Sequence, residues 1–201
     1  MMRGLHSACI VRWPGVVKPG SVSDALVEYV DIVPTFVDII GGNAAGESGW
    51  RKFQTGIDRQ EKAHKKYSFS LQTTRGINAG SPYYGIRSVY DGRYRYIVNL
   101  TPEATFQNVE TKSPLFKEWK RLAETDSHAK AMTTKYQHRP AIELYDVKND
   151  PYCMKNLAED AKQASTISRL DKELKRWMKD CGDEGQPTEM RAFEHMPGKR
   201  K

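Results

Sequence analysis

One short segment of the chain combines residue types that suit the binding of an anion. Gln72-Thr73-Thr74-Arg75-Gly76 follows a predicted strand and is rich in hydrogen-bond donors. A guanidinium can hold an anion through two parallel N–H bonds, which a point charge cannot do. The segment, with Gln72 and Arg75 as its donors, is therefore suited to contacts with an anion. An arginine that only braces a surface loop would produce the same pattern.

A second polar group precedes another predicted strand. His138-Arg139-Pro140 offers an imidazole and a guanidinium side by side. Contact with a ligand is one interpretation, and a structural pair satisfied by neighbouring protein groups is the other. The three cysteines fit no zinc or redox spacing, and they leave open either one disulfide with a free thiol or three thiols: Cys9, Cys153 and Cys181.

The charge of the chain favours an anionic partner. There are 32 basic and 25 acidic residues among 201, which gives a net charge of +7. Nucleic acid, anionic lipid and sulfated glycan would all be attracted by such a surface. Part of the excess lies in the last residues, Met190–Lys201, where a solvated tail explains it equally well. No apolar run approaches the roughly 20 residues that span a bilayer, so no membrane partner is predicted.

The elements that would position the polar groups are short. Alternation and turn signals predict strands, and period-3.6 patterns predict helices. The predicted strands are Ser7–Val11, Ala25–Val30, Tyr67–Leu71, Tyr84–Val89, Tyr94–Leu100 and Glu143–Val147. The predicted helices are Ile32–Ile40, Leu115–Ala123, His128–Tyr136 and Ser165–Cys181.

Local signals support several of these elements. Asp91-Gly92 between two strands is typical of a hairpin turn, and Asp31 is placed as the N-cap of the first helix. The helix Ser165–Cys181 has a single apolar face. After Gly182 the chain is polar, and we expect a frayed tail.

The order of these elements predicts an α+β fold, a small antiparallel sheet with helices packed on one side. We expect four parts: residues 1–42 as a strand–helix piece, 43–66 as a connecting loop, 67–182 as the sheet subdomain, and 183–201 as a polar tail. The strand–helix piece has no partners of its own in the sequence, so it is predicted to be the last unit of a larger sheet.

Three stretches, in order along the chain, carry a family resemblance. The first runs from Cys9-Ile10-Val11-Arg12-Trp13-Pro14-Gly15 to Val30-Asp31-Ile32-Val33-Pro34-Thr35, the second is Tyr84–Leu100, and the third is Glu143–Ala158 (ELYDVKNDPYCMKNLA). Together they resemble type I sulfatases of the alkaline phosphatase superfamily, in their RWPG…VDxxPT stretch, C-terminal hairpin and ELYDxxxDPxExxNLA signature. The TPEATF, SPLF and YQHRP segments look closest to N-sulfoglucosamine sulfohydrolases.

The resemblance implies a C-terminal sulfatase subdomain joined to the last strand–helix unit of an α/β catalytic domain. It implies a parent protein that hydrolyses sulfuric esters or sulfamates on heparan-like glycans, with Ca²⁺ and a formylglycine as cofactors, in the periplasm or outside the cell. The C/S-x-P-S/T-R motif that yields formylglycine is absent, and no cluster of metal ligands occurs in the sequence. We therefore expect no catalytic residue, metal ligand or cofactor in this chain, and no activity from it alone.

The resemblance also places the candidate substrate contacts. Gln72 and Arg75 would face the mouth of the active site, His138 and Arg139 would contact the sulfated sugar, and His6 would lie near the catalytic lysine of the family. A non-catalytic module that binds sulfated glycans is the alternative from a different class. The basic, aromatic hairpin could imitate a surface for single-stranded nucleic acid, but alternation explains its tyrosines as core, so no nucleic-acid partner is predicted.

Overall fold

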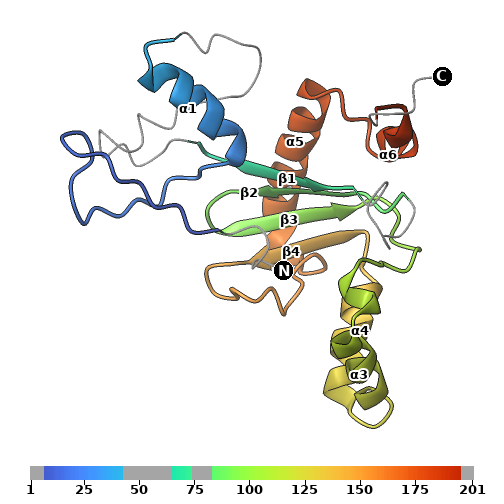
Figure 1. The fold of residues 1–201 in the computed structure, drawn as a ribbon. Coiled ribbons are helices and arrows are strands. Elements are labelled where there is room, and N and C mark those ends of the chain that lie inside the picture. Colours follow the sequence, from blue (N-terminus) through green and yellow to red (C-terminus); the bar gives the residue numbers. More distant parts are fainter. Residues whose placement is uncertain (1–6, 43–64, 74–82, 196–201) are drawn as a thin grey trace. The chain divides into compact units, whose positions relative to one another are not determined.

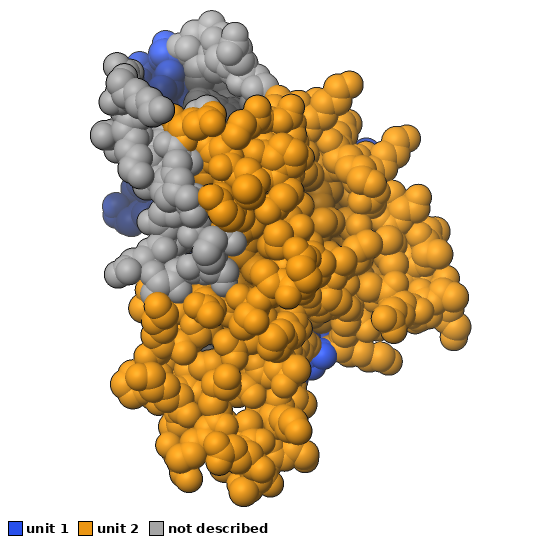
Figure 2. Space-filling view, turned by 90° about the vertical axis from the view of Figure 1, so that its right-hand side faces the viewer, with its two compact units in different colours: residues 1–68, 90–94, 146–154 blue, residues 69–89, 95–145, 155–201 orange. Residues whose placement is uncertain are grey.

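A computed structural model describes residues 7–42, 65–73 and 83–195 of the chain (Figure 1). The chain divides into two compact units, which Figure 2 distinguishes by colour. Unit 1 comprises residues 1–68, 90–94 and 146–154, and unit 2 comprises residues 69–89, 95–145 and 155–201. Two predicted substrate contacts, His6 and Arg75, lie outside the described residues, as does almost all of the predicted connection 43–66.

Four short strands form the predicted antiparallel sheet. β1 (Ser68–Gln72), β2 (Ile86–Tyr90), β3 (Tyr94–Asn99) and β4 (Ile142–Asp146) lie side by side in that order (Figure 1). The turn between β2 and β3 is the predicted Asp91-Gly92 hairpin. Asp91 Oδ1 accepts the backbone N–H groups of Arg93 and Tyr94 at 2.9 and 2.6 Å. Gly92 has a φ of 92°, which a side chain would disfavour.

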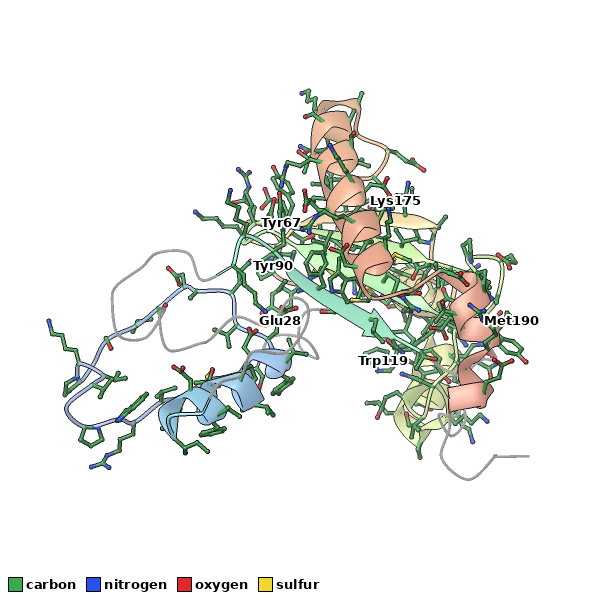
Figure 3. The ribbon with its side chains drawn as sticks, turned by 90° about the horizontal axis from the view of Figure 1, so that it is seen from above. Glu28, Tyr67, Tyr90, Trp119, Lys175 and Met190 are labelled. Carbon is green, nitrogen blue, oxygen red and sulfur yellow. The ribbon has the colours of Figure 1, made fainter. Side chains whose placement is uncertain are left out.

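Helix α5 (Ala164–Asp180) covers one face of the sheet, as the views from the front and from above both show (Figures 1 and 3). Its predicted apolar face is confirmed, because Leu170 and Leu174 are fully buried. Each such leucine contributes about 2 kcal/mol by leaving water. Trp177 of the helix stacks on Phe69 of β1 with ring centroids 5.0 Å apart, and these contacts fix the helix across the strands.

A helical pair follows β3. Helix α3 (Pro114–Leu122) begins at Ser113, whose Oγ accepts the N–H of Phe116 at 3.1 Å. Helix α4 (Ser127–Gln137) begins at Asp126, which accepts from Ala129 at 2.7 Å. Both caps satisfy amides that a helix start leaves unpaired. Aromatic rings in edge-to-face or tilted contact link this pair to the start of β2: Phe116, Tyr136, Phe106 and Tyr84.

The predicted frayed tail after Gly182 is wrong for the residues next to it. Helix α6 (Gln186–Met190) and a 3-10 turn (Ala192–His195) occupy this stretch. A segment this polar shows no apolar periodicity, so its helix could not be read from the pattern. Gly185, with a φ of 75°, turns the chain into α6, and Glu189 of α6 is buried.

Two predicted strands near the N-terminus are also wrong. Ser7–Val11 and Ala25–Val30 are not strands, and Ile10 is 93% exposed. A strand exists only when another strand satisfies its backbone groups, and apolar composition cannot supply that partner. The predicted helix is present as α1 (Ile32–Ile39), preceded by a 3-10 turn (Tyr29–Asp31).

Asp31 occupies the N-cap position of α1, but its side chain does not cap that helix. The carboxylate instead accepts the N–H of Glu28 at 2.9 Å and pairs with Lys65 at 2.6 Å. The predicted capping role is therefore corrected to a buried ion pair that closes the 3-10 turn. All three cysteines are free thiols, of which Cys153 is buried. Among the described helices none has the length and apolar character needed to cross a membrane.

Candidate functional site

Polar side chains of unit 2 gather at the end of the sheet where β1 and β3 finish and β2 and β4 begin. The backbone bonds Leu100 N–H to Gly85 C=O and Asn99 N–H to Ala141 C=O, both 2.9 Å, define this end. Gln72, the last residue of β1, belongs to it, and so do the residues that lead into β4. Two separate polar clusters lie here, one beside β1 and β2 and one beside β3 and β4.

The first cluster is built around Arg87 of β2. Its guanidinium is almost fully buried and bonds to the carboxylates of Asp183 and Glu189, with 2.9 Å between Nη2 and Glu189 Oε1. It also donates to the carbonyl of Gln72 at 3.4 Å. Burial opposes the charge of Arg87, but the hydrogen bonds to Asp183 and Glu189 outweigh it, so the pKa of the guanidinium is raised. Through its charged guanidinium, Arg87 thus links β2 to α6 and to Asp183, which precedes that helix.

Helix α6 bonds to the residues on both sides of segment 74–82. Glu189 Oε2 accepts the hydroxyl of Thr73 at 2.6 Å, and Gln186 Nε2 donates to the carbonyl of Tyr83 at 3.3 Å. Gly85 makes room for this arrangement, because a Cβ there would lie 2.5 Å from Glu189 Cγ. The backbone at Tyr83 has a φ of 57°, a region that side chains rarely adopt. These contacts fix the two residues from which segment 74–82 starts and ends.

The second cluster contains Arg139. Its Nε lies 3.7 Å from Glu143 Oε1, its side chain is 11% exposed, and its guanidinium sits over the ring of Phe106 at 5.8 Å. Glu143 also accepts from Asn99 Nδ2 at 2.8 Å and from the hydroxyl of Tyr145 at 2.5 Å. Arg139 is therefore held by the protein itself, in line with the structural interpretation of the His138-Arg139 pair. His138 is the C-cap of α4 and is exposed, and its backbone N–H donates to Thr134 C=O at 2.8 Å.

The predicted contacts that the structure describes, Gln72, His138 and Arg139, do not form one group. Gln72 ends β1, whereas His138 and Arg139 precede β4, and two strands lie between these edges. Gln72 is half-buried and, by alternation, points to the sheet face opposite Phe69 and α5. Within the described ranges no three His, Cys, Asp or Glu side chains are grouped to hold a metal ion.

Sequence reasoning missed the residues that organise this end of the sheet. Arg87 lies about a hundred positions before Asp183 and Glu189, and each of the three alone is typical of a solvated surface. The available signal was Arg87 itself, a charge within a strand whose other residues are apolar or small. A charge at such a position predicts a buried partner, but not where in the chain the partner lies.

Comparison with curated proteins finds sulfatases. Two proteins of Formosa agariphila, each named ulvan-active sulfatase, are 32% identical over 181 residues and 29% identical over 190 residues. These matches cover 90% and 92% of this chain but 34% and 31% of the relatives. The chain thus spans about a third of the length of the curated relatives it matches. No family model matches the sequence.

Solved structures agree on the fold. The sulfatase-like protein YidJ of Bacteroides fragilis superposes with a TM-score of 0.54 at 18% identity, covering 87% of this chain and 30% of that protein. A protein solved in complex with its substrate D-glucosamine-2-N,6-O-disulfate gives a TM-score of 0.61 at 18% identity, covering 88% of this chain and 29% of that protein.

The sequence is therefore similar to sulfatase sequences, and its fold is that of a sulfatase C-terminal subdomain, as predicted. The closer resemblance to N-sulfoglucosamine sulfohydrolases is not confirmed by these relatives, which are named for activity on ulvan.

Proposed function

We propose that this chain is the C-terminal part of a sulfatase that hydrolyses sulfuric esters or sulfamates on a sulfated glycan. The observation that carries the proposal is sequence similarity to ulvan-active sulfatases over 90% of the chain. Because the chain matches only about a third of those relatives, the proposed activity is that of a longer protein.

The chemistry explains why the chain alone is proposed to be inactive. Cleavage of a sulfate ester needs an activated nucleophile, a cation for the sulfuryl oxygens and an acid for the leaving group. The formylglycine motif C/S-x-P-S/T-R is absent from the 201 residues. The described part of the chain also has no ligand cluster that fits Ca²⁺. We assign both the formylglycine and the Ca²⁺ to residues outside this chain.

The contribution of this chain would be to the binding of substrate. The end of β1 is its best candidate, because α6 fixes Thr73 and Tyr83 on either side of the segment that carries Arg75. Gln72 and Arg75 would then donate to sulfate or hydroxyl oxygens, the contacts for which amide and guanidinium groups are suited. His138 is exposed and remains a candidate for a more distant sugar unit, whereas Arg139 would act by bracing Glu143. His6 remains a candidate on the resemblance alone.

The finer class of the substrate is also a proposal. The resemblance in the TPEATF, SPLF and YQHRP segments favours a heparan-like glycan with N-linked sulfate, and the curated relatives favour ulvan. A sulfatase with either substrate would work in the periplasm or outside the cell, where the enzyme encounters polysaccharides.

Sulfate release tests the function. The open reading frame would be expressed with the coding sequence upstream of Met1, and sulfate release would be measured on ulvan and on D-glucosamine-2-N,6-O-disulfate, with the 201-residue chain as control. We expect release by the longer protein on one of the two and none by the chain. No release from either substrate by a protein whose nucleophile is present and modified would contradict the proposal.

A non-catalytic module for sulfated glycans is the second candidate, favoured by the net charge of +7. Such a module differs from a part of a sulfatase in how the isolated chain behaves. The 201-residue chain would then be monodisperse and would bind heparin on its own, with an affinity that falls as salt is added.

A further inference from the structure

Strand β4 lies at one edge of the sheet, and within the described residues β3 is its only neighbouring strand. The bonds Asn99 N–H to Ala141 C=O and Val147 N–H to Arg93 C=O, each 2.9 Å, set the register. In an antiparallel ladder alternate residues bond to the neighbour, so the odd-numbered residues of β4 face β3. The N–H and C=O groups of Ile142, Leu144 and Asp146 consequently point away from the sheet.

Such outward groups form a template on which another strand can pair. In this chain the side chain of Asn156 occupies the template. Its Nδ2 donates to Ile142 C=O at 3.2 Å, and its Oδ1 accepts Leu144 N–H at 2.8 Å. The next residue completes the pattern, because Leu157 N–H donates to Leu144 C=O at 2.8 Å. A carboxamide has the same donor and acceptor as a peptide group, so Asn156 replaces one unit of a neighbouring strand.

The local chain holds Asn156 in this place. Its Oδ1 also accepts the N–H of Ala158 at 3.0 Å. The preceding turn covers the far end of the strand, since Asp146 C=O accepts the N–H groups of Asn149 and Asp150 at 3.1 and 2.7 Å. The outward groups in the middle of β4 are thus bound by Asn156 and Leu157, which we call the β4 cap.

The strand under the cap is complementary to itself. If two copies of β4 paired antiparallel about Leu144, that residue would face its own copy, Ile142 would face Asp146, and Glu143 would face Tyr145. No like charges would stand opposite each other, a condition for stable cross-strand pairs. Both backbone groups of Leu144 would bond to the second copy, and these are the groups that the cap now holds.

We propose that the β4 cap closes a self-pairing surface, so that loss of the Asn156 side chain weakens the cap and favours binding of β4 to β4 of a second copy of this chain. The inference does not rest on the proposed function. It gives the Asn-Leu-Ala end of the third sequence stretch a physical role: an exposed amide that occupies a sheet edge.

Asn156→Ala in the 201-residue chain tests the proposal, with sedimentation velocity as the measurement. Asn149→Ala is the matched control, because that side chain bonds to the carboxylate of Asp146 and not to the strand backbone. We expect Asn156→Ala to self-associate about tenfold more tightly than the wild type, a shift of about 1.4 kcal/mol. Asn149→Ala should sediment like the wild type.

A second substitution identifies the surface. Ile142 is the first residue of β4, where an edge strand tolerates proline. Ile142→Pro removes an outward N–H, so N156A combined with I142P should return to the sedimentation of the wild type. Asn156→Asp keeps the shape of the side chain but places an oxygen opposite Ile142 C=O, and we expect this variant to self-associate to an intermediate extent. It serves as the test if Asn156→Ala does not fold. Unchanged sedimentation of folded Asn156→Ala or Asn156→Asp would overturn the proposal, as would association that I142P leaves intact.

Discussion

Two polar arrangements secure opposite sides of the same sheet, and they work in different ways. Beside β1 and β2, the buried guanidinium of Arg87 is held by Asp183 and Glu189. At the edge of β4, the exposed amide of Asn156 bonds to the strand backbone. The first arrangement places charge in a medium of low dielectric, where removing one partner leaves the others uncompensated. The second exchanges hydrogen bonds with water at little cost.

The comparison assigns stability of the fold to the Arg87 cluster and specificity of binding to the β4 cap. Loss of the Arg87 cluster should unfold the chain, whereas loss of the β4 cap should leave it folded and change what it binds. Substitutions in both arrangements and in two partly exposed ion pairs test this contrast.

Arg87→Met should have the largest effect. It leaves Asp183 and Glu189 buried without their cation, and breaking a buried pair in this way costs about 4 kcal/mol. Urea denaturation followed by circular dichroism would measure the loss. A cost below about 1 kcal/mol would mean that water reaches the cluster, and the contrast with Asn156 would disappear. Thr73→Val is the control, since it removes one hydroxyl bond to Glu189 and should cost about 1 kcal/mol.

Asp146 supplies a pH-dependent test within unit 1. The hydrogen bond from Arg93, with further bonds from Asn149, lowers the pKa of this carboxyl. A lowered pKa in the folded state contributes stability above the ordinary value of about 4, and this contribution is lost as the pH falls through the lowered value. Arg93 is half exposed, so solvent screens the pair and we expect this contribution to be small.

The measurement is the urea midpoint at a series of pH values from about 6 to about 2. Asp146→Asn should lose that part of the acid dependence, and Arg93→Gln should lose it too because it removes the cause of the shift. Acid profiles identical to the wild type would show that Asp146 titrates normally in the folded chain.

Asn156→Ala should cost the folded monomer only about 1 kcal/mol, since its bonds lie at the surface. Thermal unfolding at low protein concentration, where self-association is suppressed, would measure this. A loss near that of Arg87→Met would make the β4 cap a stabilising element and would contradict its assignment to specificity.

Glu184→Gln should have the smallest effect. Glu184 is 61% exposed and pairs with Arg191, which is itself half exposed, so less than about 0.5 kcal/mol is expected. Glu189→Gln makes the same chemical change at a buried position. Comparing the two variants therefore separates the effect of burial from the effect of losing the charge. Equal losses for the two variants, measured by urea denaturation, would contradict the burial of the Arg87 cluster.

Much of the fold could be predicted because its signals are local. Asp91-Gly92 carries the hairpin turn in its own two residues, and the apolar face of α5 repeats along one helix. The prediction of two N-terminal strands failed because strand formation depends on a partner strand elsewhere, which composition cannot reveal. Helix α6 was not predicted for a related reason. It is held by the ion pair between Glu189 and Arg87, which are polar residues far apart in the sequence.

The candidate site could be predicted only in part. The position of Gln72 at a strand end follows from alternation and turn signals, and its contact with substrate stays a prediction together with that of Arg75. The pairing of Arg139 with Glu143 could not be chosen over ligand binding from sequence, since a guanidinium suits either partner. The backbone contacts of Asn156 were equally hidden, because an exposed asparagine after a turn has many ordinary explanations.

The proposal that this chain is the C-terminal part of a sulfatase is tested most directly by sequencing the DNA upstream of Met1. We predict that the open frame continues upstream and encodes a C/S-x-P-S/T-R motif in the same frame. An in-frame stop codon with no such motif between it and Met1 would contradict the claim.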